Sequence, residues 1–321
     1  MNRRQFIKGT AFLLNASLIG SLPRSRPAES YPVTLLPMAS YGIDLSREIA
    51  SAISEDGLVV KGKRVILKPN FVEVHPGRPI NTHIQVIANV AEACLKLGAS
   101  VVIVGEASGH RRDPWFSVLN PDLRTVLDKR VKCVDLNHGD AVRVANRGKR
   151  TGLSSFYIAE PVMRGDVLIS LPKLKTHHWM GVTLSLKNLF GVLPGIYYGW
   201  PKNLLHFRGI DNSILDLAET IKVHYTVIDG VVGMEGDGPI MGRAKRVGAL
   251  IMSPFSLAAD ATAARLMGFD PERIPYLAMA GRFLPGMDGS HISFRGENPK
   301  RFAMRFDCLD EFKSMQGGPF W

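Results

Sequence analysis

The sequence is poor in cysteine, which excludes several kinds of site. Its 321 residues include three cysteines, Cys94, Cys133 and Cys308. They are widely spaced and odd in number, so a dense disulfide framework, a CxxC cluster and a zinc ribbon are all excluded. Cys94 and Cys133 lie in apolar patterns, and we expect both thiols to be buried as small hydrophobic groups.

Other features are missing as well. The N-terminal apolar run, residues 11–19, is far shorter than the roughly 20 residues of a membrane-spanning helix, so no permanent membrane span is expected. No HExxH or other compact metal motif is present. Basic residues are dispersed and no known nucleic-acid motif occurs, which argues against nucleic acid as a partner.

The N-terminus that is present looks like a twin-arginine export signal. Arg3 and Arg4 precede the short apolar run, and a polar stretch with two further arginines follows it. The resemblance implies a signal over residues 1–30, and a folded protein carried by the twin-arginine export machinery to the periplasm or another exported location. Transport in the folded state also favours a cofactor bound before export. The alternative is an ordinary basic N-terminal helix.

The charge of the chain is positive with or without this segment. Removal of residues 1–30 takes away five basic residues and one acidic residue, which lowers the formal net charge from +11 to +7. A basic protein attracts anionic molecules and surfaces over long distances. We therefore expect a small anionic ligand.

The remaining residues, 31–321, alternate between short apolar runs rich in valine and isoleucine and helical patterns. Strands are predicted over residues 33–36, 64–68, 100–104, 132–136, 166–170, 225–228 and 247–252. Helices are predicted over residues 44–54, 82–97, 121–128, 182–193, 211–223 and 256–267. This alternation is typical of βα units, so we predict a single α/β domain, folded as a three-layer sandwich with a mostly parallel sheet.

Two polar residues are assigned to helix ends. Thr82, with Gln85 three residues later, is predicted to cap the helix at 82–97. Asp260 lies near the start of the helix at 256–267, where we expect it to cap that helix or complement the charge of its end.

Polar side chains follow several of the predicted strands. In open α/β sheets, ligands bind beyond the carboxyl ends of the strands. If the strands are parallel, this rule brings Asn70, Glu106, residues 173–178 and Asp229 together in one mouth.

The densest group of reactive side chains lies in residues 166–195, DVLISLPKLKTHHWMGVTLSLKNLFGVLPG. Lys173 and Lys175, spaced by two, are predicted to project to the same side of an extended segment, and Lys187 and Asn188 follow on a helix. An anion at a strand-to-helix junction is stabilised by lysine charge and by free backbone N–H groups. We predict that these residues and Asn70 bind the ligand; the alternative is a solvated basic loop.

Two adjacent histidines belong to the same segment. Neighbouring side chains face opposite ways on a strand and diverge by about 100° on a helix, so at most one of His177 and His178 is predicted to point into the site. Catalysis by one of them, with Asp229 as a further acid or base, is one interpretation. Ligation of a metal is the other.

A glycine-rich stretch over residues 227–242, VIDGVVGMEGDGPIMG, carries Asp229, Glu235 and Asp237. Glycine lets the backbone approach a ligand closely, and carboxylates at this spacing suit a hard divalent cation such as Mg²⁺ or Ca²⁺. The stretch matches neither a Walker loop nor a dinucleotide fingerprint. The alternative is a glycine-rich turn with solvated acids.

Four motifs in this order resemble the family called domain of unknown function 362: ILKPNFV, LPKLKTHHWMGVTLSLKNLFGVLPG, VIDGVVGMEGDGPIMG and DATAARLMGFDPERIPYL. The resemblance covers about residues 64–280 and implies no catalytic roles. Several members of that family also carry ferredoxin-like cysteine motifs. This chain has no cysteine motif for an intrinsic iron–sulfur cluster, which leaves a divalent metal or a noncovalently bound cofactor as the alternatives.

Two functions from different classes remain open at this point. The first is an exported enzyme that acts on a small anionic substrate with a bound metal or cofactor. The second is a noncatalytic accessory or maturation protein that carries a ligand or metal through the export route. The same residues would serve both, so residue types alone do not separate them.

Overall fold

The computed structural model describes residues 30–73, 75, 77–109 and 121–317. The predicted export signal, except for its last position, lies outside these residues. Among the described helices, none has the length and apolarity needed to cross a membrane.

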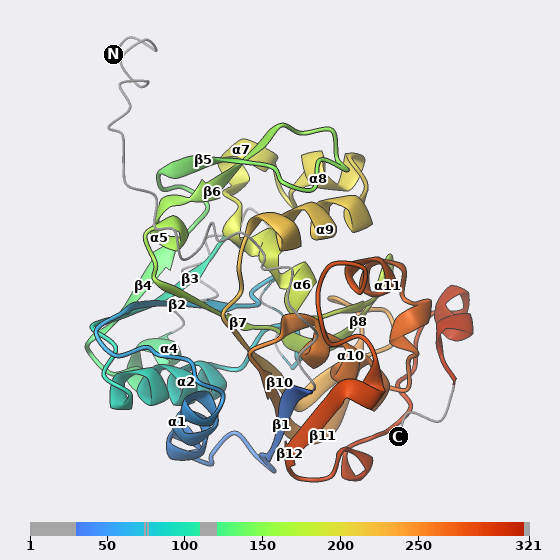
Figure 1. Ribbon diagram of the computed structural model, residues 1–321, viewed down its shortest axis with the longest axis horizontal. Helices are drawn as coiled ribbons and strands as arrows, with labels where there is room; N and C mark the ends of the chain where they lie inside the picture. Colours follow the sequence, from blue (N-terminus) through green and yellow to red (C-terminus); the bar gives the residue numbers. More distant parts are fainter. Residues whose placement is uncertain (1–29, 74, 76, 110–120, 318–321) are drawn as a thin grey trace.

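Ten strands form the main sheet, in the order β12-β1-β11-β10-β7-β2-β3-β4, with β8 beside β10 and β9 beside β8 (Figure 1). Their bounds are β1 Tyr31–Pro37, β2 Arg64–Pro69, β3 Val101–Glu106, β4 Val131–Asp135, β7 Val167–Leu171, β8 Lys173–His177, β9 Gly181–Thr183, β10 Tyr225–Glu235, β11 Arg243–Ser253 and β12 Ile292–Gly296. Strand β11 pairs antiparallel with β1 and β10, and β9 with β8, whereas the other pairs described are parallel. The sheet is therefore mostly parallel, as predicted.

A separate antiparallel hairpin consists of β5 Ala141–Ala145 and β6 Ser155–Ala159. The α-helices are α1 Ser46–Glu55, α2 Ile84–Lys96, α4 Pro121–Val126, α5 Glu160–Met163, α6 Ser185–Asn188, α7 Gly195–Tyr198, α8 Asn203–Phe207, α9 Ile210–Thr220, α10 Ser256–Leu266 and α11 Pro275–Ala280. Short 3-10 helices are η2 Leu189–Val192, η3 Pro271–Arg273, η4 Gly289–His291, η5 Pro299–Arg301 and η6 Asp310–Met315.

Helices cover both faces of the sheet and produce three layers (Figure 1). Side chains alternate along β2, so Val65 and Leu67 pack into the core beneath α1, α2 and α4, while Ile66 packs into the core beneath α6, α9, α10 and α11. Because both faces of the central strands are buried, these strands contain largely apolar runs, such as residues 65–67 of β2. The predicted three-layer α/β sandwich is confirmed.

The predicted helix over residues 182–193 is wrong at its start. Val182 and Thr183 belong to β9, which folds back on β8, and α6 lasts one turn before η2 follows. Gly181, the first residue of β9 after the turn at residues 178–180, has a φ of 73°, a value that favours glycine. Pairing with β8 therefore outweighs the helical pattern.

Both predicted helix-end roles are corrected. The cap of α2 is His83, whose Nδ1 accepts a hydrogen bond from the backbone N–H of Gln85, while the Thr82 hydroxyl accepts from Asn70 N and donates to Leu171 O. Thr82 thus ties the ends of β2 and β7 together. Asp260 lies within α10 and caps α6 instead of its own helix, because its carboxylate reaches the first N–H groups of α6.

Candidate functional site

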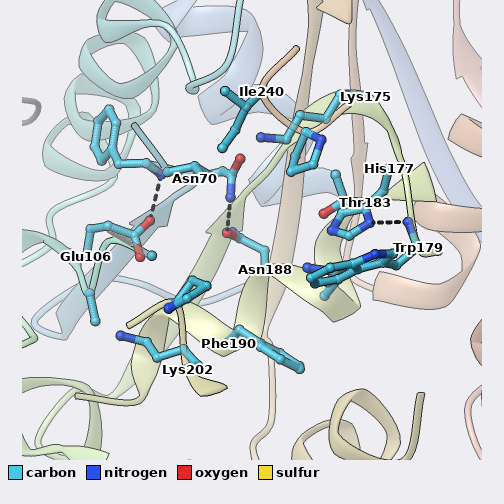
Figure 2. Close-up of a pocket in the computed structure, with 18 of the residues that line it drawn as sticks. Asn70, Glu106, Lys175, His177, Trp179, Thr183, Asn188, Phe190, Lys202 and Ile240 are labelled. Atoms are coloured by element: carbon cyan, nitrogen blue, oxygen red, sulfur yellow. Dashed lines mark hydrogen bonds between the residues drawn. The ribbon is translucent and has the colours of Figure 1, made fainter. Parts of the chain in front are cut away.

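A cavity of about 360 Å³ opens beyond the carboxyl ends of β2, β3 and β8. Helix α6 forms one wall, and residues around α8 form another. Figure 2 shows the side chains from these elements converging on the same space. The position agrees with the strand-end rule for open α/β sheets.

A buried ion pair lies at the base of the cavity. Lys68 Nζ is 2.8 Å from Glu106 Oε2, and it also donates to Pro69 O and to Asn188 Oδ1. Burial lowers the pKa of the Lys68 amine and raises the pKa of the Glu106 carboxyl, while the attraction between the two acts in the opposite direction. The Asn188 amide donates to Lys68 O and holds its own oxygen toward the pair.

Gly191 lets the chain pass close to this ion pair. A Cβ at this position would overlap Glu106 Oε1 and Lys68 Nζ. The Gly191 carbonyl accepts a hydrogen bond of 3.0 Å from Ala107 N, which fixes η2 against the end of β3. A side chain at residue 191 would therefore displace either the loop or the ion pair.

Three further lysines line the cavity, and their amines have no carboxylate partner among the described residues. Lys175 Nζ donates to Ile80 O at 2.7 Å, Lys202 Nζ donates to an asparagine oxygen at 2.8 Å, and Lys187 Nζ lies 5.2 Å from the centre of the Phe190 ring. Among the described residues, none of these amines forms an ion pair with a carboxylate. Uncompensated amines in a partly desolvated cavity favour an anionic ligand.

Burial changes the acidity of all three amines. It lowers the pKa of Lys187 to about 8 and the pKa of Lys202 to about 8. For Lys175, burial followed by the neighbouring charges of Lys187 and Lys173 lowers the pKa well below its ordinary value. Near neutral pH, Lys187 and Lys202 are therefore mostly protonated, whereas Lys175 is the amine that loses its proton most readily.

Two histidines of the cavity hold their protons on different nitrogens. His177 Nδ1 accepts the backbone N–H of Trp179 at 3.1 Å, so the proton of the neutral ring is on Nε2. His206 Nδ1 lies 3.0 Å from Lys202 O, which only accepts, so Nδ1 carries the proton and Nε2 has a free lone pair. Burial is the main cause that lowers the pKa of both rings, which keeps them neutral.

His178 lines the cavity together with His177, against the prediction that at most one of them would. The strand ends at His177 and a turn begins at His178, so the alternation of side chains expected for a strand stops there. The His178 side chain is partly exposed, and its Nδ1 is 3.6 Å from Asp237 Oδ1.

Asn70 has an unused acceptor in the cavity wall. Its Nδ2 is 3.5 Å from Asn188 Oδ1, but its buried Oδ1 has no hydrogen-bond partner within the described part of the chain. Figure 2 shows the Asn70 amide between Ile240 and Asn188. A buried acceptor without a donor is costly, and a bound ligand that donates a hydrogen bond would satisfy it.

Lys173 and Asp229 do not line the cavity, so the predicted mouth contains only part of the expected set. Lys173 Nζ lies 2.8 Å from Asp229 Oδ2 and 2.8 Å from Tyr41 Oη. Asp229 also accepts hydrogen bonds from the Tyr41 hydroxyl and from His83 N. Tyr41 stacks on the His83 ring, with 3.5 Å between ring centres. Asp229 is thus fully engaged in a second polar network.

The acidic glycine stretch does not bring its carboxylates together. Glu235 is held by Arg243 Nε at 3.0 Å and by Lys245 Nζ at 3.1 Å, whereas Asp237 is exposed beside His178. No group of three or more His, Cys, Asp or Glu side chains in the described part of the chain is placed to hold a metal ion. A cation at Glu235 would have to displace its basic partners.

Sequence reasoning found Asn70, Lys175, Lys187, Asn188 and the histidine pair, and the cavity brings these residues together. It missed several other members, among them Lys68, Lys202 and Trp179. Lys68 could have been noticed as a lysine that ends an apolar strand pattern, RVILKP. Lys202 and Trp179 carry no such signal, because loops and short helices place them.

Comparisons with known proteins agree with the sequence motifs. The chain is 30% identical over 257 residues to the thylakoid-associated protein sll1697 of Synechocystis sp., which covers 77% of this chain and 76% of that protein. A solved structure, the lactate racemase apoprotein from Thermoanaerobacterium thermosaccharolyticum, superimposes with a TM-score of 0.45 at 13% identity, over 76% of this chain and 59% of that one. The family model described as domain of unknown function (DUF362) matches residues 65–265. The chain therefore belongs to the DUF362 family.

Proposed function

We propose that this protein is an enzyme that binds a small organic anion in the cavity and moves protons on it. The observation that carries the proposal is the group of three lysines, Lys175, Lys187 and Lys202, whose amines meet in one cavity without a carboxylate partner among the described residues. An anion would supply the missing negative charge. In a partly desolvated cavity this attraction is stronger than in water.

The walls of the cavity favour an anion with an apolar part. Phe71, Trp179 and Phe190 contribute aromatic surface, and Asn70 contributes an acceptor for a ligand hydroxyl or amine. A volume of about 360 Å³ suits a small molecule and not a polymer chain.

The histidines supply both halves of a proton transfer. His206 Nε2 has the lone pair of a general base, and His177 Nε2–H has the proton of a general acid. Their pKa values are lowered, so both rings are available in the neutral form near pH 7. Lys187 and Lys202 would hold the anionic group of the substrate while the two rings act.

Calorimetric titration tests the binding half of the proposal. Phenylacetate is the probe, and phenylacetamide is its uncharged counterpart. We expect phenylacetate to bind and Lys187→Gln to weaken it about tenfold. Lys300→Gln removes the same charge from an exposed position and should leave the affinity unchanged. Equal affinity for the acid and the amide would contradict an anion site.

Proton transfer is tested by hydrogen exchange in D₂O. Proton NMR would follow the loss of the methyl C–H signal of pyruvate, because this group lies next to the keto carbonyl. The protein should accelerate this loss, and His206→Gln should abolish the acceleration while retaining affinity for the anion. Binding without any acceleration would favour the noncatalytic carrier over the enzyme.

We also propose that the protein is exported by the twin-arginine route, on the strength of the Arg3 and Arg4 pattern. Replacement of both arginines by lysine should retain the protein in the cytoplasm of a bacterial host. Export of the variant at the level of the original protein would contradict this route. Any metal or noncovalent cofactor would be found by elemental analysis and native mass spectrometry of the exported protein.

A further inference from the structure

We infer that Lys175 reacts covalently, its amine forming an imine with a carbonyl group of the bound anion. The substrate class is then a small 2-oxo acid or an anionic aldehyde. This inference rests on the proposed function, because the cavity must first hold the anion. It replaces the expected role of Lys175 as a charged contact.

The contacts of Lys175 distinguish it from Lys68 and Lys173, two other buried lysines. Lys68 and Lys173 each lie 2.8 Å from a carboxylate oxygen, which stabilises their charged forms. Lys175 is 1% exposed and donates to Ile80 O, and in the described part of the chain no carboxylate pairs with it. The carbonyl oxygen of Ile80 accepts one N–H of the amine, so the lone pair of the neutral Lys175 nitrogen remains available to attack a carbonyl carbon.

Burial and most of the charges around Lys175 disfavour its protonated form. Burial has the largest effect, followed by the charges of Lys187 and Lys173, while Glu106 acts in the opposite direction. A lysine that is desolvated beside other cations is an activated nucleophile. The lowered pKa of Lys175 follows from this placement.

The position of the amine fits an attack on a bound carbonyl. Figure 2 shows the Lys175 side chain extending toward Asn70 and Ile240, at the edge of the cavity. His177 follows two residues later on β8 and presents a neutral Nε2–H. Lys187, on the wall formed by α6, remains to bind the carboxylate of the same molecule.

The reaction balances without an oxidant or a second substrate. The Nζ lone pair attacks the carbonyl carbon, and the carbonyl oxygen takes a proton to give a carbinolamine. The hydroxyl of the carbinolamine is then protonated and leaves as water. The nitrogen loses its remaining proton, and the C=N bond forms. The net change is amine plus carbonyl to imine plus water. Protonation of the imine would make the neighbouring C–H acidic, which links this step to proton transfer by His206.

Reductive trapping tests the inference on the full chain. The protein would be incubated with glyoxylate, pyruvate or phenylpyruvate and sodium cyanoborohydride, then analysed by intact mass and peptide mapping. We expect a single adduct on Lys175 with at least one of the three acids. Lys175→Arg should lower the total yield of the trapped adduct at least about tenfold, while Lys300→Arg should leave that yield unchanged. No adduct, or an adduct that persists on another lysine in Lys175→Arg, would overturn the inference.

Phenyllactate separates failure of the imine from failure of the cavity. It keeps the carboxylate and the ring of phenylpyruvate, but a hydroxyl replaces the keto group that an amine could attack. Calorimetric binding of phenyllactate without trapping of any oxo acid would refute the imine and leave the anion site standing. Absence of both binding and trapping would refute the two proposals together. Circular dichroism and the melting temperature of Lys175→Arg would show whether that variant folds.

Discussion

The carboxylate of Asp260, inside α10, accepts the backbone N–H of Ser185 at 2.7 Å, at the start of α6. Its other oxygen accepts the N–H of Leu186 at 2.9 Å. These bonds satisfy N–H groups that a helix start otherwise leaves without partners. Because α6 carries Lys187 and Asn188, a side chain outside the cavity fixes two of the residues that line it.

Replacement of Asp260 by asparagine should loosen this wall of the cavity. An asparagine side chain has one acceptor oxygen, so one of the two N–H groups loses its partner. We expect a loss of about 1–3 kcal/mol in the free energy of unfolding, measured by urea denaturation, together with weaker anion binding. Unchanged anion affinity in the folded variant would show that α6 does not depend on Asp260.

The stability that Asp260 contributes should also depend on pH. Burial raises its pKa to about 7 in the folded protein, above the value of 3.8 for a free side chain. The folded state therefore binds the proton more tightly than the unfolded state. The stabilisation that this proton binding provides is complete below about pH 4 and is lost as the pH rises to about 7. The gap in stability between the original protein and Asp260→Asn should be larger at pH 5 than at pH 8. A gap that widens with pH would contradict the raised pKa.

Anion binding should weaken in alkaline solution. Lys187 and Lys202 each have a pKa lowered to about 8, so both lose their charge as the pH passes that value. Affinity for phenylacetate should fall by up to about tenfold per pH unit for each amine that must be protonated. Arginine stays charged, so Lys187→Arg should make the decline less steep in calorimetric titrations between pH 6 and 10. An affinity that stays constant over this range would exclude both amines from the anion site.

Lys187→Met should separate stability from binding. Methionine has a similar length but no charge, so it removes the cost of keeping an amine away from water. We expect a gain on the order of 1 kcal/mol in the free energy of unfolding, with an approximately tenfold loss of phenylacetate affinity. Lys300→Met, at an exposed position, is the control and should change neither quantity appreciably. A destabilised Lys187→Met would mean that the lysine has a structural role.

The fold was predictable because its strongest signal is local. An apolar run such as the one around Ile66 identifies a strand that is buried on both faces, and the helices between such runs follow from their periodicity. The helix predicted at 182–193 was wrong at its start, because local periodicity does not detect pairing between strands. Val182 pairs with Thr176 across a short hairpin, and that pairing decides its conformation.

Only those site residues that lie at or near the ends of strands were predictable. Asn70 and Lys175 follow or belong to strands, so the topology of a parallel sheet places them together. The partners of Asp229 could not be read in the same way. Tyr41 and His83 reach it from distant positions in the chain and draw it into a separate network with Lys173. Pairwise contacts of this kind depend on tertiary packing and leave no pattern in one sequence.

The ion pair between Lys68 and Glu106 gives the largest expected change in stability. Both side chains are almost fully buried, so Glu106→Gln would leave the Lys68 charge without a counter-ion in a site that excludes water. The glutamine oxygen still accepts the hydrogen bond from Phe71 N, which isolates the effect of charge. We expect a loss of about 3–5 kcal/mol in urea denaturation.

A second substitution and a control identify the origin of that loss. Lys68→Met combined with Glu106→Gln should recover a large part of it, because the unpaired charge is then gone. Glu235→Gln is the matched control, since its partners Arg243 and Lys245 are more exposed and can be hydrated. Its cost should be about 1 kcal/mol or less. If Glu106→Gln costs no more than Glu235→Gln, water reaches Lys68, and the base of the cavity is wetter than the packing around Gly191 implies.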